Sequence, residues 1–382
     1  MKHLKRRWLA LIGCALICIG GCRNRSGGET EKKYEKISDY LYYMELDDYT
    51  FSPDPDKEIK MSGMGCSSVR KGDLYGRNLD LTYGETPEFI IKLDAAEDRF
   101  ASIGVCADPT ITPYPDQMTE EELLSMPNIT NDGINENGVI VSENIVDATG
   151  VDDLSGTAPG KDKLHASRVV RYLLDRAESA EHAVTLLYGV DIVGGFTGYA
   201  LHFMIADADN TFVVEIIDGD IVVSCNEFFC MTNFYLLYGP VREEQVAAGT
   251  AFRDLPMFTK YPIGAERYCI LRDGYPEISD AEGMADLLYR VRGTAMYDPE
   301  NDPAWYTECC GGSLTAHAGV RSFETRLKQL TSLYHVRDRR EPKGDWITWH
   351  SSVYEFSSRT LHIRSQENKE EFTFSLDKGR VN

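Results

Sequence analysis

Short apolar runs bounded by turn residues recur along most of the chain and constrain its fold more than any other feature. Examples are "EFIIKL" (88–93), "FASIGVCA" (100–107) and "YALHFMIADADNTFVVEIIDGDIVVSCNEFFCMTNF" (199–234), which contains Asp-Asn and Asp-Gly turns. Such runs predict antiparallel strands joined as hairpins. Helical patterns occur between them, at 164–189, 265–273 and 280–292. Hairpins with separate helices, instead of βαβ alternation, favour an α+β fold of antiparallel sheets covered by helices.

The first 21 residues have the pattern of an export signal. Four basic side chains precede the apolar stretch Trp8–Ile19, and two glycines then lead to Cys22. The stretch is too short to span a bilayer, so residues 1–21 are interpreted as a signal peptide. "IGGC" resembles a bacterial lipobox, which implies lipidation of Cys22 and an extracytoplasmic protein anchored in the cell membrane. The alternative is an ordinary secretory signal in which Cys22 is incidental.

The charge balance argues against one class of partner. The formal net charge is −21, and removal of the four positive charges in residues 1–21 would bring it to about −25. A surface this acidic has no basic patch from which nucleic acid would release counterions, so no nucleic-acid partner is expected. The 42% hydrophobic residues are enough to bury a full core, as one large domain or two small ones.

Ten cysteines are present, and seven lie beyond the leader and the lipobox cysteine, at positions 66, 106, 225, 230, 269, 309 and 310. Their number is odd and they form no Cys-x-x-Cys pair, so a structural zinc site is not indicated. Outside the cytoplasm some could form disulfides, for example Cys225 with Cys230, although the sequence does not assign the bonds. Cys66 is the candidate for a separate, chemical role.

The region between the leader and Cys66 divides into two parts. Residues 23–33 are polar and contain Gly and Ser, as expected of a flexible tether. Residues 34–49 have apolar side chains at helical spacing and predict an amphipathic helix packed on the body: Tyr34, Ile37, Leu41 and Met44. Two prolines then end it.

Cys66 begins a segment with a strong hairpin signal. "CSSVRKGDLYGRNLDL" predicts two strands turning at Lys71-Gly72-Asp73. A thiol nucleophile needs a base or a depressed pKa, and no histidine lies near Cys66 in the sequence. Its own α-amino group, with a pKa near ~8, could serve if the chain were cut before Cys66. Gly65 would give the backbone freedom that self-cleavage requires.

The same segment, "CSSVRKGDLYGRNLDLTYGET", resembles the start of the mature chain in the choloylglycine hydrolase family, which includes bile salt hydrolases and penicillin V acylases. Further resemblances follow in the family's order, at "GINENGV", "LHFMIADADNTFVVEI", "MTNF", "ERY" and "SSVYEFSSRTLHIRSQENKEEFTFSL". Together they cover nearly everything from Cys66 to the C-terminus. The resemblance implies an αββα N-terminal-nucleophile hydrolase sandwich at 66–382, preceded by a tether and propeptide at 22–65.

The resemblance also implies roles for six residues. Cys66 would be the nucleophile, with Asp80 holding its freed amine. Arg77 would steady the thiolate and Arg267 would support the cluster. Asn233 would donate to the oxyanion, and Asn144 is the second oxyanion candidate, although its spacing from "NENG" is one residue short of that in bile salt hydrolases.

The implied activity is hydrolysis of a linear, non-peptide amide of the bile salt, penicillin V or N-acyl amide type. No metal or organic cofactor is implied. The same residues would also suit an acyltransferase of this fold, or a surface binding lipoprotein that has lost catalysis. Neither the substrate nor the formation of a homo-oligomer is settled by the sequence.

Taken singly, several of these residues have ordinary structural explanations. Asp80 could cap a turn, Asn233 could belong to one, and Arg267 could form a surface ion pair. His202, within an apolar strand, is interpreted as a hydrogen-bonded core histidine.

Overall fold

The structure is a computed structural model whose contacts separate residues 1–33 from a second unit, residues 34–382. All that follows concerns the second unit. Its described residues are 34–54, 66–81, 86–107, 113–147, 158, 160–194, 199–217, 219–233, 235–236, 265–292, 347–365 and 370–382. Within these ranges no helix is both long and apolar enough to cross a membrane.

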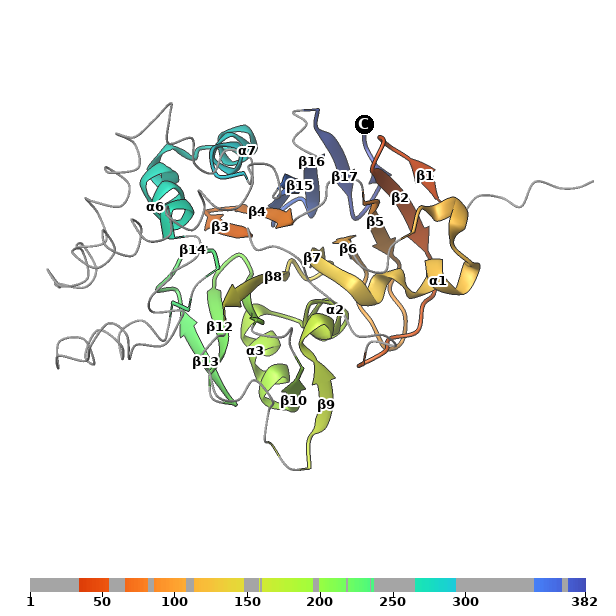
Figure 1. The fold of residues 1–382 in the computed structure, drawn as a ribbon, viewed down its shortest axis with the longest axis horizontal. Helices are drawn as coiled ribbons and strands as arrows, with labels where there is room; N and C mark the ends of the chain where they lie inside the picture. The colour runs from red at the N-terminus through yellow and green to blue at the C-terminus, as the bar shows by residue number, and fades with distance from the viewer. Residues whose placement is uncertain are drawn as a thin grey trace, which may run out of the picture. The chain divides into compact units, whose positions relative to one another are not determined.

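Two large sheets make up the centre of this unit (Figure 1). In spatial order, the described strands of the first are β1 (Glu35–Lys36), β2 (Leu41–Leu46), β5 (Glu88–Leu93), β6 (Ser102–Cys106), β7 (Thr130–Asn135), β8 (Ile140–Asp147), β11 (Tyr199–Ala206), β12 (Thr211–Ile217) and β13 (Asp220–Cys225). Those of the second are β14 (Cys230–Met231), β3 (Ser67–Lys71), β4 (Leu74–Leu81), β15 (Ile347–Glu355), β16 (Thr360–Ser365), β17 (Phe372–Ser375) and β18 (Gly379–Arg380).

Helices cover the outer face of each sheet. Helix α2 (Val169–Arg176) packs on β7 and β8, and α3 (Ala180–Tyr188) packs on β11 and β12. On the other side, α6 (Ala265–Gly274) contacts β3 and β14, and α7 (Ala281–Arg290) contacts β4 and β15 (Figure 1). Smaller elements complete the described part: β9 (Asp162–His165), β10 (Val190–Val193), α1 (Glu120–Ser125), η1 (Pro115–Gln117), η2 (Met126–Ile129), η3 (Ala166–Arg168) and η5 (Tyr275–Glu277). The expected αββα sandwich is confirmed.

The predicted hairpin after Cys66 is confirmed. Strands β3 and β4 form the hairpin that follows Cys66, and Gly72 takes a φ of 57° in its turn. Residues other than glycine rarely adopt this positive φ, which explains why the turn has a glycine at position 72. Helix α1 begins with the reciprocal capping box of Thr119 and Glu122. His202 is buried between Glu215 and the carbonyl of Thr232, as a core histidine.

The helix predicted at 34–49 is wrong. Residues 35–46 form β1 and β2, and β2 pairs in parallel with β5 at the edge of the first sheet. In "LYYMEL" five of six side chains are buried, so both faces of the strand are covered. Sheet pairing and two-sided burial of β-favouring tyrosines outweigh the helical spacing of the apolar residues. This pairing is also an exception to the expected antiparallel arrangement.

After β2 the chain crosses helix α2. The Tyr49 hydroxyl donates to buried Asp175 at the end of α2, and the ring of Phe51 lies 6.0 Å from that of Tyr172. The Ser52 N–H donates to Asn128, and His165 N–H donates to the carbonyl of Pro53. Residues 34–54, called here the upstream segment, are therefore built into the body.

The suggested Cys225–Cys230 disulfide is not formed. Neither residue is disulfide-bonded. Cys225 ends β13 in the first sheet and is exposed, whereas Cys230 lies in β14 of the second sheet and is buried. The two sulfurs therefore lie in different surroundings.

Candidate active site

Cys66 immediately precedes β3 and is 1% exposed. In the β3–β4 register Ser68, two residues after Cys66, lies opposite Arg77. Five predicted site residues are as deeply buried as Cys66: Arg77, Asp80, Asn144, Asn233 and Arg267. Cys22 and Gly65 lie outside the described residues.

Arg267 gathers three of the predicted residues. Its Nη1 donates to the carbonyl oxygen of Cys66 at 2.5 Å and lies 3.9 Å from the Asp80 carboxylate. Its Nη2 donates to Asn233 Oδ1 at 2.5 Å. Helix α6 supplies this guanidinium, whose planar fork reaches several acceptors at once. Arg267 is therefore a buried bridge within the cluster, and the surface ion pair considered from sequence is excluded.

Asp80 is held from β15 and lies next to the thiol. The Thr348 hydroxyl donates to Asp80 Oδ1 at 2.6 Å. The backbone of Asp80 also hydrogen-bonds to the Cys66 sulfur. This carboxylate is thus placed where an α-ammonium group on Cys66 would find a counter-charge.

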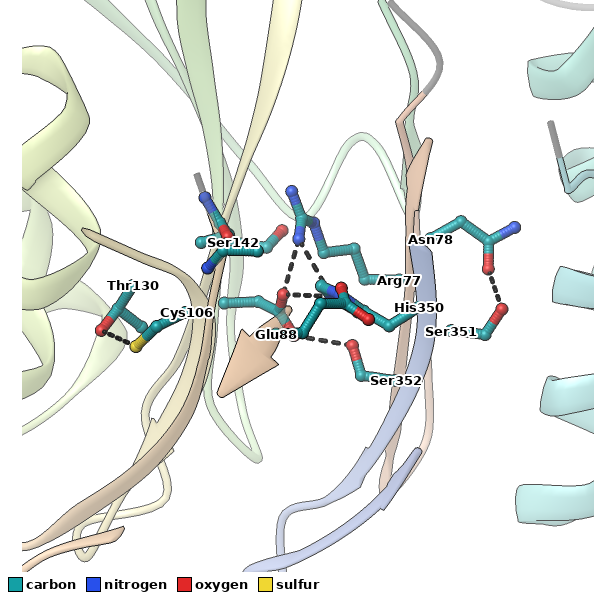
Figure 2. Close-up of polar contacts among 12 residues, drawn as sticks. Arg77, Asn78, Glu88, Cys106, Thr130, Ser142, His350, Ser351 and Ser352 are labelled. Atoms are coloured by element: carbon teal, nitrogen blue, oxygen red, sulfur yellow. Dashed lines mark hydrogen bonds and ion pairs between the residues drawn. The ribbon is translucent and has the colours of Figure 1, made fainter. Parts of the chain in front are cut away.

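Arg77 points from β4 into the space between the sheets, whereas its neighbour Asn78 points toward the helices (Figure 2). Its Nη1 donates to Asp132 at 2.6 Å and its Nη2 donates to the carbonyl of Glu143 at 2.7 Å. Both acceptors belong to the first sheet, so Arg77 joins the two sheets beside the nucleophile's strand.

The two candidate oxyanion donors, Asn144 and Asn233, lie together but differ in how many acceptors their side-chain N–H groups already have. Asn144 Nδ2 donates to the carbonyls of Met231 and Thr232, at 3.2 and 3.3 Å, which occupies both of its N–H groups. Asn233 Nδ2 donates at 2.6 Å to the carbonyl of Ile145, its one acceptor among the described residues. Since a side-chain amide has two N–H donors, Asn233 keeps one for a substrate.

The thiol is not activated by its surroundings alone. Burial raises the pKa of Cys66, and the Asp80 carboxylate raises it further. Arg77, the Asp80 backbone and Arg267 oppose these effects without reversing them. The arrangement therefore needs a nearby base to take the thiol proton.

Sequence reasoning missed the side chains that surround Arg77. His350 lies between Glu88 and Asp132, and all three are fully buried (Figure 2). Their signal was present in "WHSSVYEF", where His350, Ser352 and Tyr354 alternate along β15. Alternate residues of a strand share a face, so this pattern indicates a polar stripe facing the other sheet.

Comparison with known proteins bears on the fold. Residues 69–248 match the family model described as acyl-coenzyme A:6-aminopenicillanic acid acyl-transferase. Two variants of the conjugated bile acid hydrolase from Clostridium perfringens superpose with TM-scores of 0.50 and 0.51 at 15% and 16% identity, each match covering 82% of this chain and 93% of the other. The chain has the N-terminal-nucleophile hydrolase fold.

The fold that the resemblance to the choloylglycine hydrolase family implies is thereby confirmed. Penicillin V acylase from Agrobacterium tumefaciens also matches, with a TM-score of 0.44, 15% identity and coverage of 82% of this chain and 86% of that one. No curated protein matches the sequence at a significant level.

Proposed function

We propose that this chain is cut before Cys66 and then hydrolyses a linear, non-peptide amide with Cys66 as its N-terminal nucleophile. The observation that carries the proposal is the position of Arg267, which contacts Cys66 and Asn233 and lies 3.9 Å from Asp80. The fold is similar to that of a conjugated bile acid hydrolase, which supports a hydrolytic reaction of this class.

The proposed reaction uses groups of this chain alone. The freed α-amine of Cys66 takes the thiol proton, and Asp80 stabilises the resulting ammonium. The sulfur attacks the substrate carbonyl, and the remaining N–H of Asn233 donates to the oxyanion. The intermediate collapses to a thioester as the ammonium protonates the departing amine. Water, deprotonated by the same amine, then releases the acid and restores the thiol.

Acyl transfer is the second candidate, and the family model supports it because that model is named for an acyl-transferase. In this reaction an amine instead of water would take the acyl group from the thioester. Product analysis with a competing amine separates the two: hydrolysis gives the free acid, whereas transfer gives a new amide whose share rises with amine concentration.

We further propose that the protein is a lipoprotein, anchored through Cys22 to the outer side of the cell membrane. Cleavage before Cys66 would separate the lipid from the catalytic chain. The contacts of Tyr42, Met44 and Tyr49 with the core support retention of the upstream segment after cleavage. Active chain found wholly in the medium would contradict retention.

The experiment that tests catalysis incubates the purified protein with linear amides, including bile conjugates and phenoxymethylpenicillin, and detects the released acid by mass spectrometry. The control is Cys66→Ala, which should release none. Cys230→Ala, at another buried cysteine that is not disulfide-bonded, should retain activity. A protein that binds an amide without turning it over, with the Gly65–Cys66 bond intact, would favour the binding-lipoprotein alternative.

A further inference from the structure

A buried ladder of four ionisable side chains, Glu88, His350, Asp132 and Arg77, crosses repeatedly between the sheets. Figure 2 labels Glu88, His350 and Arg77. Glu88 Oε1 lies 2.6 Å from His350 Nδ1, and His350 Nε2 lies 2.9 Å from Asp132 Oδ1. The same Asp132 oxygen accepts from Arg77 Nη1 at 2.6 Å. Glu88 and Asp132 come from β5 and β7, while His350 and Arg77 come from β15 and β4.

The ladder is balanced in charge only if His350 is a cation. Two carboxylates then face two positive groups, and both imidazole nitrogens donate to carboxylate oxygens. Burial lowers the pKa of His350, but Asp132 and Glu88 outweigh burial and raise it to about 9. Hydroxyl groups occupy the remaining carboxylate positions: Ser365 donates to Glu88, and Ser352 and Tyr354 donate to Asp132.

The orientation of Arg77 depends on this ladder. Its Nη1 is held by Asp132 and its Nη2 by the carbonyl of Glu143. Its Nε, which is buried, has no hydrogen-bond partner among the described residues. Arg77 also lies close enough to Cys66 to lower the pKa of the thiol. A shift of Asp132 would therefore move the guanidinium relative to Cys66.

We propose that His350 is a positioning residue: as a buried cation it joins Glu88 to Asp132, and it thereby fixes the Arg77 guanidinium within electrostatic reach of the Cys66 thiol. This role rests on the proposed function, in which Cys66 is the nucleophile. Its test does not, because it measures thiol and imidazole properties without any amide substrate.

The first measurement is the rate of Cys66 alkylation by iodoacetamide against pH, read by peptide mass spectrometry. His350→Gln removes the cation but leaves both carboxylates, so the thiol pKa should rise and alkylation at pH 7 should slow about 3- to 10-fold. The double variant His350→Gln/Glu88→Gln removes one charge of each sign, and its rate should return to within about twofold of the unchanged protein. His362→Gln, at a half-buried histidine of β16, is the matched control and should react like the unchanged protein.

The second measurement observes the imidazole of His350 directly. NMR of 15N-histidine-labelled protein should show a His350 imidazole with both nitrogens protonated at pH 8, and His202→Gln identifies the signal of the other buried histidine that faces acceptors at both nitrogens. A neutral imidazole for His350 at pH 7 would overturn the proposal. So would an unchanged Cys66 rate in His350→Gln, or a double variant as slow as the single one. If His350→Gln does not fold, the NMR result decides.

Discussion

The guanidinium of Arg267 donates to the carbonyl oxygen of Cys66 at 2.5 Å, across 201 positions of sequence. The same guanidinium donates to Asn233. One helix residue therefore fixes both the proposed nucleophile and the proposed oxyanion donor, and its loss should affect both.

Arg267→Lys should lower amide turnover about a hundred-fold, because a lysine ammonium cannot span Cys66 and Asn233 as the guanidinium fork does. The check is kcat for the best amide found in the substrate screen. The control is Arg290→Lys, in an exposed pair with Glu277, which should leave kcat unchanged. Equal losses in the two variants would contradict the bridging role.

The two asparagines should differ in their effect on rate. Asn233→Ala should lower kcat about 10²- to 10³-fold, because it removes the amide with an N–H still available to an oxyanion. Asn144→Ala should lower kcat less and should mainly reduce stability, because both N–H groups of Asn144 already donate to carbonyls. Measurement of kcat together with the denaturation midpoint separates the two effects. A larger kcat loss in Asn144→Ala would reverse the assignment.

The upstream segment should stay bound after cleavage until the protein is denatured. Tyr49→Phe removes the hydroxyl that donates to buried Asp175 and should reduce the free energy of unfolding by about 1–3 kcal/mol. The fragment should then dissociate at a lower guanidinium concentration than in the unchanged protein. Size-exclusion chromatography measures this dissociation. Tyr188→Phe, at a tyrosine that is 49% exposed, is the control. Release of the fragment from the unchanged protein in native buffer would show that the segment is not a lasting part of the body.

Glu143 should make stability depend on pH. Burial raises its pKa from the ordinary value of 4.5 to about 8, against the opposing effects of Arg77 and Asn131. The folded chain thus binds this proton up to a higher pH than the unfolded chain, so the free energy of unfolding should fall as pH rises from 4.5 to 8, by up to about 1.4 kcal/mol per unit. Urea unfolding of Glu143→Gln should show a shallower fall across this window. A parallel profile in the two proteins would refute the assignment.

Local sequence signals predicted much of this fold. The β3–β4 hairpin depends on neighbouring residues, so it could be predicted directly from the sequence. Residues 41–46 were misread as a helix because their state is decided by pairing with β5, a contact that periodicity does not report.

The candidate site shows the same division. Cys66, Arg77 and Asp80 lie on one hairpin whose sequence pattern is distinctive. Asn233 and Arg267 were predicted from motifs that follow in the same order as in the choloylglycine hydrolase family. His350 was missed because it is 273 positions from Arg77 in the sequence. The two residues are brought together by the pairing of β4 with β15, whose register cannot be predicted from local sequence patterns. The ladder's other members come from strands of the opposite sheet.

Intact mass and N-terminal sequencing of the purified protein lacking residues 1–21 test the central claim most directly. The account predicts a catalytic chain that begins at Cys66, formed without added protease, together with the separated upstream fragment. Cys66→Ala should remain a single uncut chain. An unsubstituted protein that stays intact through Gly65–Cys66, or that is cut equally well in Cys66→Ala, would contradict self-activation.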